Sequence, residues 1–224
     1  KLYFDIYANQ LDLYFWTGTP EENIRSYLRL TGTPFLPPKW AFEYWAGGGW
    51  MVWNTPDSSH ALSRIQEVLD NYKKMDIPIH QIYLEVKPDP KIFEMLTEQG
   101  VRALLWTDSV LRPDNETDFR YDRMRVKKAS RPDEPLLNEY VDFTDPAFED
   151  AFYEKYHMLT GKGLYGLMID YADCMPEDAL CYNGRTGTEM HNGYAYWYAK
   201  SMNQAFQKRL GEDFMLFQRS GCAG

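Results

Sequence analysis

The stretch GLYGLMIDYADCMPED, residues 163–178, sets the pattern by which the rest of the chain can be interpreted. Within it, the short apolar run 167–169 leads directly into Asp170, and further carboxylates follow by residue 178. An apolar run of this length, bounded by turn residues, is typical of a buried strand. A buried strand that ends on a carboxylate has two interpretations: Asp170 opens an ordinary acidic loop, or it is held there for chemistry.

On both sides of this strand, the chain alternates between strand and helix patterns from Trp40 onward. We expect strands at residues 40–45, 80–86, 101–108, 165–170 and 213–220, helices at residues 57–75, 89–99, 144–161 and 189–210, and a long polar loop with one possible hairpin over residues 109–143. Apolar strands with helices between them predict a parallel sheet with both faces covered. The predicted fold class is therefore α/β.

Two α/β architectures fit this alternation, a doubly wound open sheet and a β/α barrel. GGGW at residues 47–50 follows a predicted strand, but it lacks the G-x-G-x-x-G spacing and the immediate helix of a nucleotide-binding turn. Polar and aromatic residues instead gather at the predicted strand ends: Trp50, Glu85, Trp106, Asp108, Asp170 and Arg219. In a β/α barrel the carboxyl ends of the strands converge on one site. We therefore favour a (β/α)8 TIM-type barrel, of which about five β/α units are present.

The first part of the chain follows a different pattern. Residues 2–16 are aromatic and alternating, which predicts a β-hairpin, and residues 19–31 carry the capping signals of a short helix. A proline-rich connector, TPFLPPKW, follows at residues 33–40. We predict a domain boundary at this connector, with the end of a β-rich domain, this helix and the connector in residues 1–36 and the predicted barrel in residues 37–224. The chain is thus expected to begin within a domain.

Composition argues against several classes of function. The net charge of −9 leaves no basic surface for a nucleic-acid partner. The three cysteines have no metal-ligand spacing, and free thiols are favoured over a Cys174–Cys181 disulfide, so no metal or cofactor is expected. The sequence has no apolar run of about 18 residues, so no membrane span is expected. The cellular compartment and a possible homo-oligomer are left open.

Aromatic residues make up 16% of the chain, and aromatic faces stack on sugar rings as well as in protein cores. An acidic site with aromatic walls and no metal-ligand pattern suggests glycoside chemistry. In that chemistry one carboxylate acts near the anomeric carbon and one carboxylic acid acts near the leaving oxygen. Asp170 is the candidate for the first role, and the alternative is that it only accepts hydrogen bonds from its loop.

Seven stretches of the chain carry a resemblance that covers nearly its whole length. They are TGTPFLPPKWAFEYW (31–45), YKKMDIPIHQIYLE (72–85), PDPKIFEMLTEQGVRALLW (88–106), YVDFTDPAFEDAFYEKY (140–156), GLMIDYAD (166–173), MHNGYAYWYAKSMNQAF (190–206) and FQRSGCAG (217–224). In this order and at this spacing they resemble glycoside hydrolase family 31. The resemblance implies a barrel enzyme that hydrolyses α-linked glycosides. It also implies that residues 1–36 are the end of an N-terminal β-sandwich domain and that residues 37–224 are the N-terminal part of the catalytic barrel.

The resemblance also implies a role for each candidate residue. Asp170 would be the nucleophile, forming a covalent glycosyl ester that water then hydrolyses with retention. Arg219 would bind sugar hydroxyls and the nearby carboxylate through its fork of donors, and Glu85 would accept hydrogen bonds from sugar hydroxyls. Trp106 would form an apolar wall and Trp50 would stack at the mouth of the site, with plain core packing as the alternative for both tryptophans.

The chain departs from the family pattern at four points. Asp173, a candidate substrate-binding residue, stands where Glu is usual, and Glu85 stands where Asp is usual. Met168 occupies a position that is often Trp or Lys, and the loop after Glu85 is shorter than the family's. These departures leave a non-catalytic carbohydrate-binding relative of the same barrel as the alternative function.

The resemblance places the general acid, an Asp, downstream of the Arg-Ser pair at residues 219–220. The sequence stops at Gly224, so we expect the acid beyond that residue and expect residues 1–224 alone to be incomplete for activity. The implied function is an exo-acting α-glycosidase with a carbohydrate substrate. Small changes in the pocket decide which sugar and linkage it takes.

Overall fold

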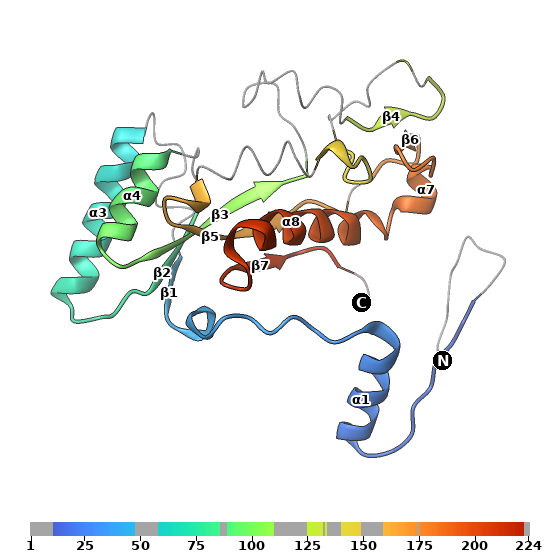
Figure 1. The fold of residues 1–224 in the computed structure, drawn as a ribbon, viewed down its shortest axis with the longest axis horizontal. Coiled ribbons are helices and arrows are strands. Elements are labelled where there is room, and N and C mark those ends of the chain that lie inside the picture. The colour runs from blue at the N-terminus through green and yellow to red at the C-terminus, as the bar shows by residue number, and fades with distance from the viewer. Residues whose placement is uncertain are drawn as a thin grey trace. The chain divides into compact units, whose positions relative to one another are not determined.

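The computed structural model describes residues 11–47, 58–85, 89–109, 125–131, 133, 140–148, 159–173 and 175–221. The chain divides into two compact units, of which the first contains Lys1–Leu36 and the second Pro37–Cys222. Figure 1 traces the chain and labels its helices and strands. The second unit contains the strands and helices that the sequence assigns to the barrel.

The first unit contains the helix α1 (Pro20–Thr31), at the position that the sequence predicts. Thr19 and Glu22 form a reciprocal capping box, in which the Thr19 backbone N–H donates to Glu22 Oε2 at 2.8 Å. Residues 11–16, the described part of the predicted hairpin's second half, are exposed and carry no strand. Residues 1–10 lie outside the described part of the chain, so the β-rich character of this unit stays a prediction.

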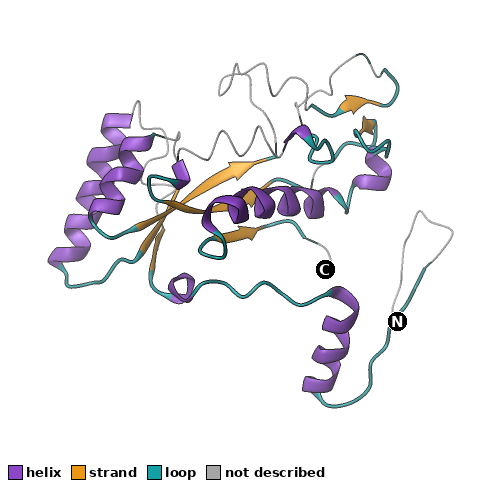
Figure 2. Cartoon of the chain, viewed as in Figure 1, coloured by secondary structure: helices purple, strands orange, loops and turns teal. Residues whose placement is uncertain are grey.

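Five parallel strands form the sheet of the second unit, in the spatial order β1-β2-β3-β5-β7. They are β1 (Trp45–Gly47), β2 (Gln81–Leu84), β3 (Arg102–Asp108), β5 (Leu164–Asp170) and β7 (Met215–Gln218). Their order in space follows their order in the chain, whereas a doubly wound sheet reverses direction at its switch point. This order fits a barrel, which is not closed, because β1 and β7 do not pair within the described residues (Figures 1 and 2).

The sheet is strongly curved. Neighbouring strands lie about 4.8 Å apart, so β2 and β7, which have two strands between them, would lie about 14 Å apart in a flat sheet. The ring centroid of Tyr83 on β2 nevertheless lies 5.9 Å from that of Phe217 on β7, and the centroid of Trp45 on β1 lies 5.6 Å from the same ring. Side chains meet across such a span only if the sheet curls around them, as it does in the interior of a barrel.

Two helices of the second unit lie where the sequence predicts them: α3 (Ser58–Lys74) and α4 (Pro90–Glu98). Asp89 caps α4 by accepting a hydrogen bond from the Lys91 N–H at 2.9 Å. Most of the predicted helix at residues 144–161 lies outside the described part of the chain.

The helix predicted at residues 189–210 is divided into two, α7 (Gly187–Met190) and α8 (Tyr194–Leu210). A second capping box, between Thr186 and Glu189, starts α7 earlier than predicted. The turn between the two helices contains Gly193, which has a low helix propensity.

The strand predicted at residues 40–45 is wrong over most of its length. Lys39–Phe42 form a 3-10 turn, and β1 begins only at Trp45. Two indoles fix the turn: the Trp40 N–H donates to Asp213 Oδ1 at 2.6 Å, and the Trp45 N–H donates to the Ala41 carbonyl at 2.9 Å. Apolar runs this short do not by themselves distinguish a strand from a helical turn.

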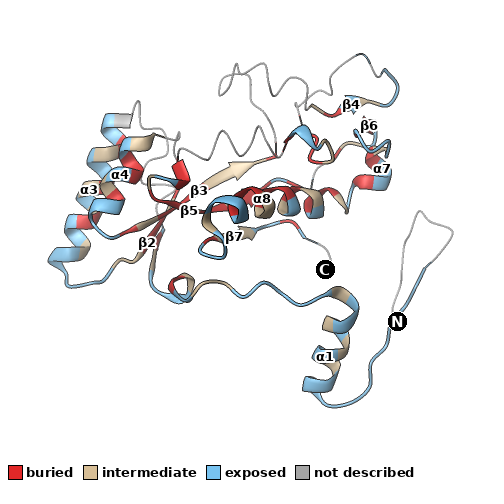
Figure 3. Cartoon of the chain, viewed as in Figure 1, coloured by how far each residue is buried: buried red, intermediate tan, exposed pale blue. Residues whose placement is uncertain are grey.

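The outward face of the sheet carries the hydrophobic core. Alternate residues of the strands, such as Ile82 on β2 and Leu167 and Ile169 on β5, are buried in one cluster with apolar residues of α3, α4 and α8. α4 packs on β3, and α8 packs on β5 and β7 (Figures 1 and 3). The helices therefore cover the outside of the curved sheet and leave the inward face to aromatic and polar side chains.

A short antiparallel pair joins the long polar loop to the segment after β5. β4 (Lys127–Lys128) pairs with β6 (Ala179–Leu180). Within the loop itself, an isolated antiparallel bridge joins Arg125 to Val141, and the Val126 N–H donates to the Tyr140 carbonyl at 2.9 Å, so the described residues show antiparallel pairing where one hairpin is predicted. Asp178 reinforces the junction by accepting hydrogen bonds from the hydroxyl and the N–H of Ser130 at 2.7 and 2.9 Å. These bonds lower the pKa of Asp178. This acid has a structural partner and belongs to the loop.

The Cys181 thiol is free and buried. Burial, together with the nearby charge of Asp142, raises the pKa of Cys181 to about 12. Because the thiolate is the reactive form, we expect Cys181 to resist alkylation by iodoacetamide at pH 8.5 in the folded protein and to react readily in denaturant. Mass spectrometry of the Cys181 peptide before and after unfolding tests this, and equal labelling in the two states would contradict it.

Candidate active site

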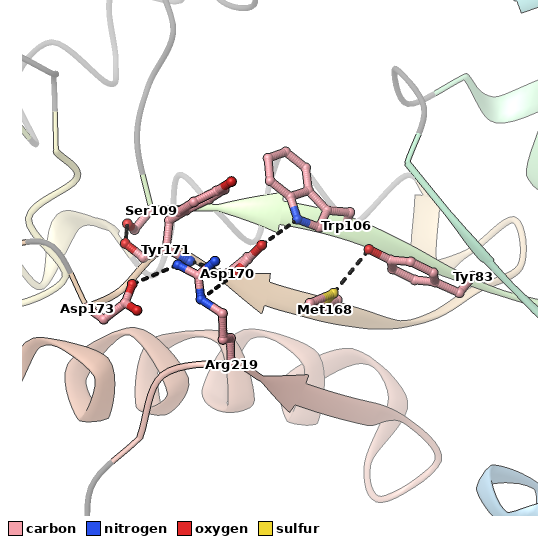
Figure 4. A network of polar contacts seen from close by, with 8 residues as sticks. All are labelled: Tyr83, Trp106, Ser109, Met168, Asp170, Tyr171, Asp173 and Arg219. Atoms are coloured by element: carbon pink, nitrogen blue, oxygen red, sulfur yellow. Dashed lines mark hydrogen bonds and ion pairs between the residues drawn. The ribbon is translucent and has the colours of Figure 1, made fainter. Parts of the chain in front are cut away.

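The carboxyl ends of three neighbouring strands bring four of the candidate side chains together (Figure 4). Trp106 lies on β3, Asp170 ends β5, Arg219 directly follows β7, and Asp173 lies in the turn after β5. The register also places Asp108 of β3 beside Asp170. This clustering follows from parallel strands in a curved sheet, whose carboxyl ends all lie at one rim.

Asp170 is buried, with 6% of its surface exposed, and its carboxylate faces several donors. Oδ1 accepts the backbone N–H of Tyr171 at 2.9 Å and lies 3.3 Å from Arg219 Nε. Oδ2 accepts the indole N–H of Trp106 at 3.0 Å. Buried charges are tolerated when they are paired and hydrogen-bonded in this way. The site therefore holds a carboxylate in one fixed orientation at the end of the strand.

Arg219 connects two carboxylates. Its Nη2 donates to Asp173 Oδ1 at 2.8 Å, while its Nε faces Asp170. The hydrogen bond to Asp173, followed by the charge of Asp170, raises the pKa of Arg219. The side chain is 43% exposed, so solvent reaches the guanidinium and weakens both ion pairs. Part of its hydrogen-bonding capacity is therefore open to a ligand.

Glu85 lies directly after β2 and is held by a neighbour on the same strand. The Tyr83 hydroxyl donates to Glu85 Oε1 at 2.8 Å and lies 3.0 Å from the sulfur of Met168 on β5. Burial first, and then this hydrogen bond, strongly raise the pKa of Tyr83, so the phenol stays neutral and acts as a donor. This hydrogen bond holds the Glu85 carboxylate, whose side chain is one methylene longer than that of Asp, beside Tyr83 on the inward face of the sheet.

The sequence did not single out Tyr171, Ser109 or Tyr83 as members of this network. Tyr171 contacts Arg219 and Trp106 through its ring, Ser109 donates to the Tyr171 carbonyl at 2.7 Å, and Tyr83 holds Glu85. Their contacts depend on strand register and on the positive φ of Tyr171. Tyr83 is the one aromatic residue of β2, and an aromatic residue in an apolar strand is as typical of core packing as of a binding site.

Trp50 lies outside the described residues, so its place at the mouth of the site stays a prediction. Within the described part of the chain, no group of three or more His, Cys, Asp or Glu side chains is arranged to hold a metal ion. None of the helices described is long and apolar enough to cross a membrane. The described site is thus a cluster of carboxylates and aromatic rings around one arginine.

A model of the glycosyl hydrolases family 31 TIM-barrel domain matches residues 34–224. The chain belongs to glycoside hydrolase family 31. The family match covers the whole sheet described above, so the prediction of a TIM-type barrel is confirmed. The described strands form an open part of that barrel.

Curated relatives of this family 31 chain are glycosidases. The chain is 23% identical to alpha-xylosidase XylQ of Lactiplantibacillus pentosus over 249 residues, and this alignment covers 98% of this chain and 32% of the relative. It is 22% identical to alpha-glucosidase 2 of Bacillus thermoamyloliquefaciens over 259 residues, and this alignment covers 99% of this chain and 32% of the relative. The chain therefore spans about a third of the length of these two relatives.

Solved structures show the same fold. A cycloalternan-degrading enzyme from Trueperella pyogenes superimposes with a TM-score of 0.74 at 21% identity, covering 93% of this chain and 36% of the other. A family 31 sulfoquinovosidase from E. rectale, in complex with an aza-sugar inhibitor, gives a TM-score of 0.70 at 20% identity, covering 90% of this chain and 34% of the other.

Proposed function

We propose that the full-length protein is a retaining, exo-acting α-glycosidase with Asp170 as its nucleophile. The observation that carries the proposal is the placement of Asp170, a buried carboxylate at the carboxyl end of a barrel strand, fixed by an indole N–H, a backbone N–H and a guanidinium. Active sites of β/α barrels lie at this end, and glycoside cleavage needs a carboxylate beside the anomeric carbon. Family membership and the glycosidase relatives support the same reaction class.

The hydrogen bonds distinguish the two oxygens of Asp170. Each oxygen of a carboxylate offers about two lone-pair sites. Among the described residues, Oδ1 faces two donors, the N–H of Tyr171 and Nε of Arg219, whereas Oδ2 faces one, the indole N–H of Trp106. Oδ2 therefore keeps a lone pair for bond formation, and we assign it as the attacking oxygen.

In the proposed reaction, Oδ2 of Asp170 attacks the anomeric carbon from the side opposite the leaving group. The glycosidic C–O bond breaks as the leaving oxygen takes a proton from a general acid, which leaves a glycosyl ester on Asp170. The deprotonated acid then takes a proton from water as the water oxygen attacks the anomeric carbon, and Asp170 departs as a carboxylate. Two displacements retain the anomeric configuration. We expect the acid to be an Asp beyond Gly224.

The neighbouring groups would bind the sugar. We assign Arg219 and Asp173 to hydrogen bonds with its hydroxyls, because both are exposed enough to meet a ligand while still ordering each other. Glu85, oriented by Tyr83, would accept another hydroxyl. The Trp106 ring would face the apolar side of the sugar, and Trp50 is proposed to stack at the mouth.

Covalent labelling tests the proposal. The full-length protein would be incubated with a cyclitol epoxide or a 2-fluoro glycosyl fluoride of α-glucose or α-xylose configuration, the two sugars named by the curated relatives. We expect stoichiometric loss of activity and a mass increment on the peptide that contains Asp170. Sugar binding without hydrolysis or labelling would instead support the non-catalytic alternative, to which the Glu85 and Asp173 departures point.

Replacing Arg219 by lysine should lower kcat/KM for an aryl α-glycoside about 100-fold. Lysine keeps the charge but loses the planar fork that reaches Asp170 and Asp173 together, and small misplacements of catalytic groups have effects of this size. Steady-state kinetics of the full-length variant measure the effect. Arg64→Lys is the matched control, since Arg64 pairs with Glu67 on the surface of α3, and equal losses in the two variants would refute the role of Arg219.

A further inference from the structure

The residue after Asp170 has a strained backbone. Tyr171 has φ of +58°, and within the described residues only Asp76 shares a positive φ with it among non-glycine residues. Asp76 lies in the turn that follows α3, where short polar residues adopt this conformation readily. An aromatic residue does so rarely. Strain of this kind persists only where the surroundings fix it, and it often marks a functional position.

Two neighbouring strand ends fix the backbone of Tyr171. Its N–H donates to Asp170 Oδ1 at 2.9 Å, and its carbonyl accepts the hydroxyl of Ser109 at 2.7 Å. Ser109 follows β3 directly and is fully buried. The left-handed turn thus directs the N–H of Tyr171 back onto the carboxylate of Asp170, and Ser109 holds the turn from the adjacent strand.

The side chain of Tyr171 meets the other two residues around Asp170 (Figure 4). Arg219 Cζ lies 4.4 Å from the centre of the Tyr171 ring, within the range of a cation–π contact. The Trp106 and Tyr171 rings pack nearly at right angles, with a centroid distance of 6.1 Å and an interplanar angle of 84°. Tyr171 therefore contacts the two side chains, Arg219 and Trp106, that direct N–H groups at the Asp170 carboxylate in the described structure.

The position of the Arg219 guanidinium depends on contacts such as the one with the Tyr171 ring. Its side chain is long, 43% exposed, and must direct Nε to Asp170 and Nη2 to Asp173 at the same time. Freezing a flexible arginine costs conformational entropy, and water competes for its exposed hydrogen bonds. A flat aromatic surface beneath the guanidinium limits its rotation while leaving its in-plane N–H groups directed at the two carboxylates.

We propose that Tyr171 is a positioning residue, whose ring holds the Arg219 guanidinium between Asp170 and Asp173 and whose N–H orients Asp170. For its kinetic consequences this inference rests on the proposed glycosidase function. Tyr171 acts through Arg219 and Asp170: it keeps two donors on Oδ1 and so leaves Oδ2 available for attack. Tyr171 positions these two residues, but it neither transfers a proton nor forms a covalent bond with the substrate.

The test uses three substitutions in the full-length protein. Tyr171→Phe keeps the ring and Tyr171→Leu removes the aromatic face with little loss of apolar volume. Tyr171→Gly removes the ring but accepts the positive φ without strain, so it keeps the proposal testable if the leucine variant folds poorly. Tyr182→Leu is the control, because Tyr182 is an exposed tyrosine in a loop away from this network.

We expect Tyr171→Leu and Tyr171→Gly to lower kcat/KM for an aryl α-glycoside about tenfold, mainly through kcat, with Tyr171→Phe within about threefold of the unchanged protein. In the Arg219→Lys background, the leucine substitution should cost less than twofold more, because its effect passes through Arg219. Full additivity of the two substitutions, or a phenylalanine variant as slow as the leucine variant, would overturn the proposal.

A second measurement is independent of catalysis. Hydrogen exchange of the Arg219 Nε proton, followed by NMR in arginine-labelled protein, should be slow in the unchanged and Tyr171→Phe proteins and at least tenfold faster in Tyr171→Gly. Equal exchange rates would refute the positioning role even if the enzyme is active. If the protein hydrolyses no glycoside but the exchange rates differ as expected, the proposed function fails while the role of Tyr171 stands.

Discussion

Replacing Asp170 by alanine in the full-length protein is expected to lower kcat for an aryl α-glycoside by about 10⁴-fold or more, since losses of this order follow removal of a catalytic nucleophile. Alanine leaves no group that can form the glycosyl ester. The indole N–H of Trp106 and the backbone N–H of Tyr171 also lose their acceptor. Because unsatisfied buried donors cost about 1–3 kcal/mol each, the unfolding free energy should be measured on the same sample.

Chemical rescue separates lost chemistry from lost folding. Azide is small enough to enter the space that the Asp170 carboxylate leaves, and it would attack an activated aryl α-glycoside from the side that Oδ2 faces. One displacement inverts the anomeric centre, so the expected product is a β-glycosyl azide, identified by NMR. Rescue that returns an α-glycosyl azide, or no rescue in a folded variant, would contradict the assignment of Asp170 as the nucleophile.

Glu177→Gln provides the matched control for this experiment. Glu177 is an acid in the same acidic stretch, but it is exposed and lies in the turn before β6. We expect this variant to retain the kcat of the unchanged protein. A comparable loss in both variants would mean that the stretch acts through its total charge, which would remove the reason for choosing Asp170.

The barrel could be predicted from the sequence because its signals are local. Each main strand is a short apolar run, the helices between them carry caps and regular spacing, and no nucleotide-binding turn appears after the first strand. The errors arose where the local signal is ambiguous. Lys39–Phe42 is apolar enough for a strand, but the long-range bond between Trp40 and Asp213 holds it as a helical turn.

The candidate site was predictable only in part. Asp170, Trp106 and Arg219 stand at the ends of recognisable strands, and parallel pairing in chain order brings those ends together. The role of each residue remains a proposal. The contribution of Tyr171 could not be foreseen, since its place in the network depends on a positive φ and on a serine from another strand. Neither of these leaves a pattern in the sequence.

Replacing Gly166 by alanine should destabilise the full-length protein by about 3 kcal/mol, at the upper end of the usual cost of overpacking. Gly166 lies in β5, between β3 and β7, and an added Cβ would lie 2.0 Å from the Met215 carbonyl oxygen and 3.0 Å from Leu104 Cδ2. The oxygen belongs to the backbone of β7, so the clash can be relieved only by moving that strand. Denaturant unfolding measures the change in stability.

The same movement should reduce activity, because Arg219 follows β7 directly and would be displaced from Asp170. Gly47→Ala is the matched control: Gly47 also lies in a strand, β1, and its added Cβ would meet no described atom within 4 Å. We expect the control to change the unfolding free energy by less than about 1 kcal/mol. Equal destabilisation by the two substitutions would show that glycine backbone entropy, and not the approach of β7 to β5, sets the cost at Gly166.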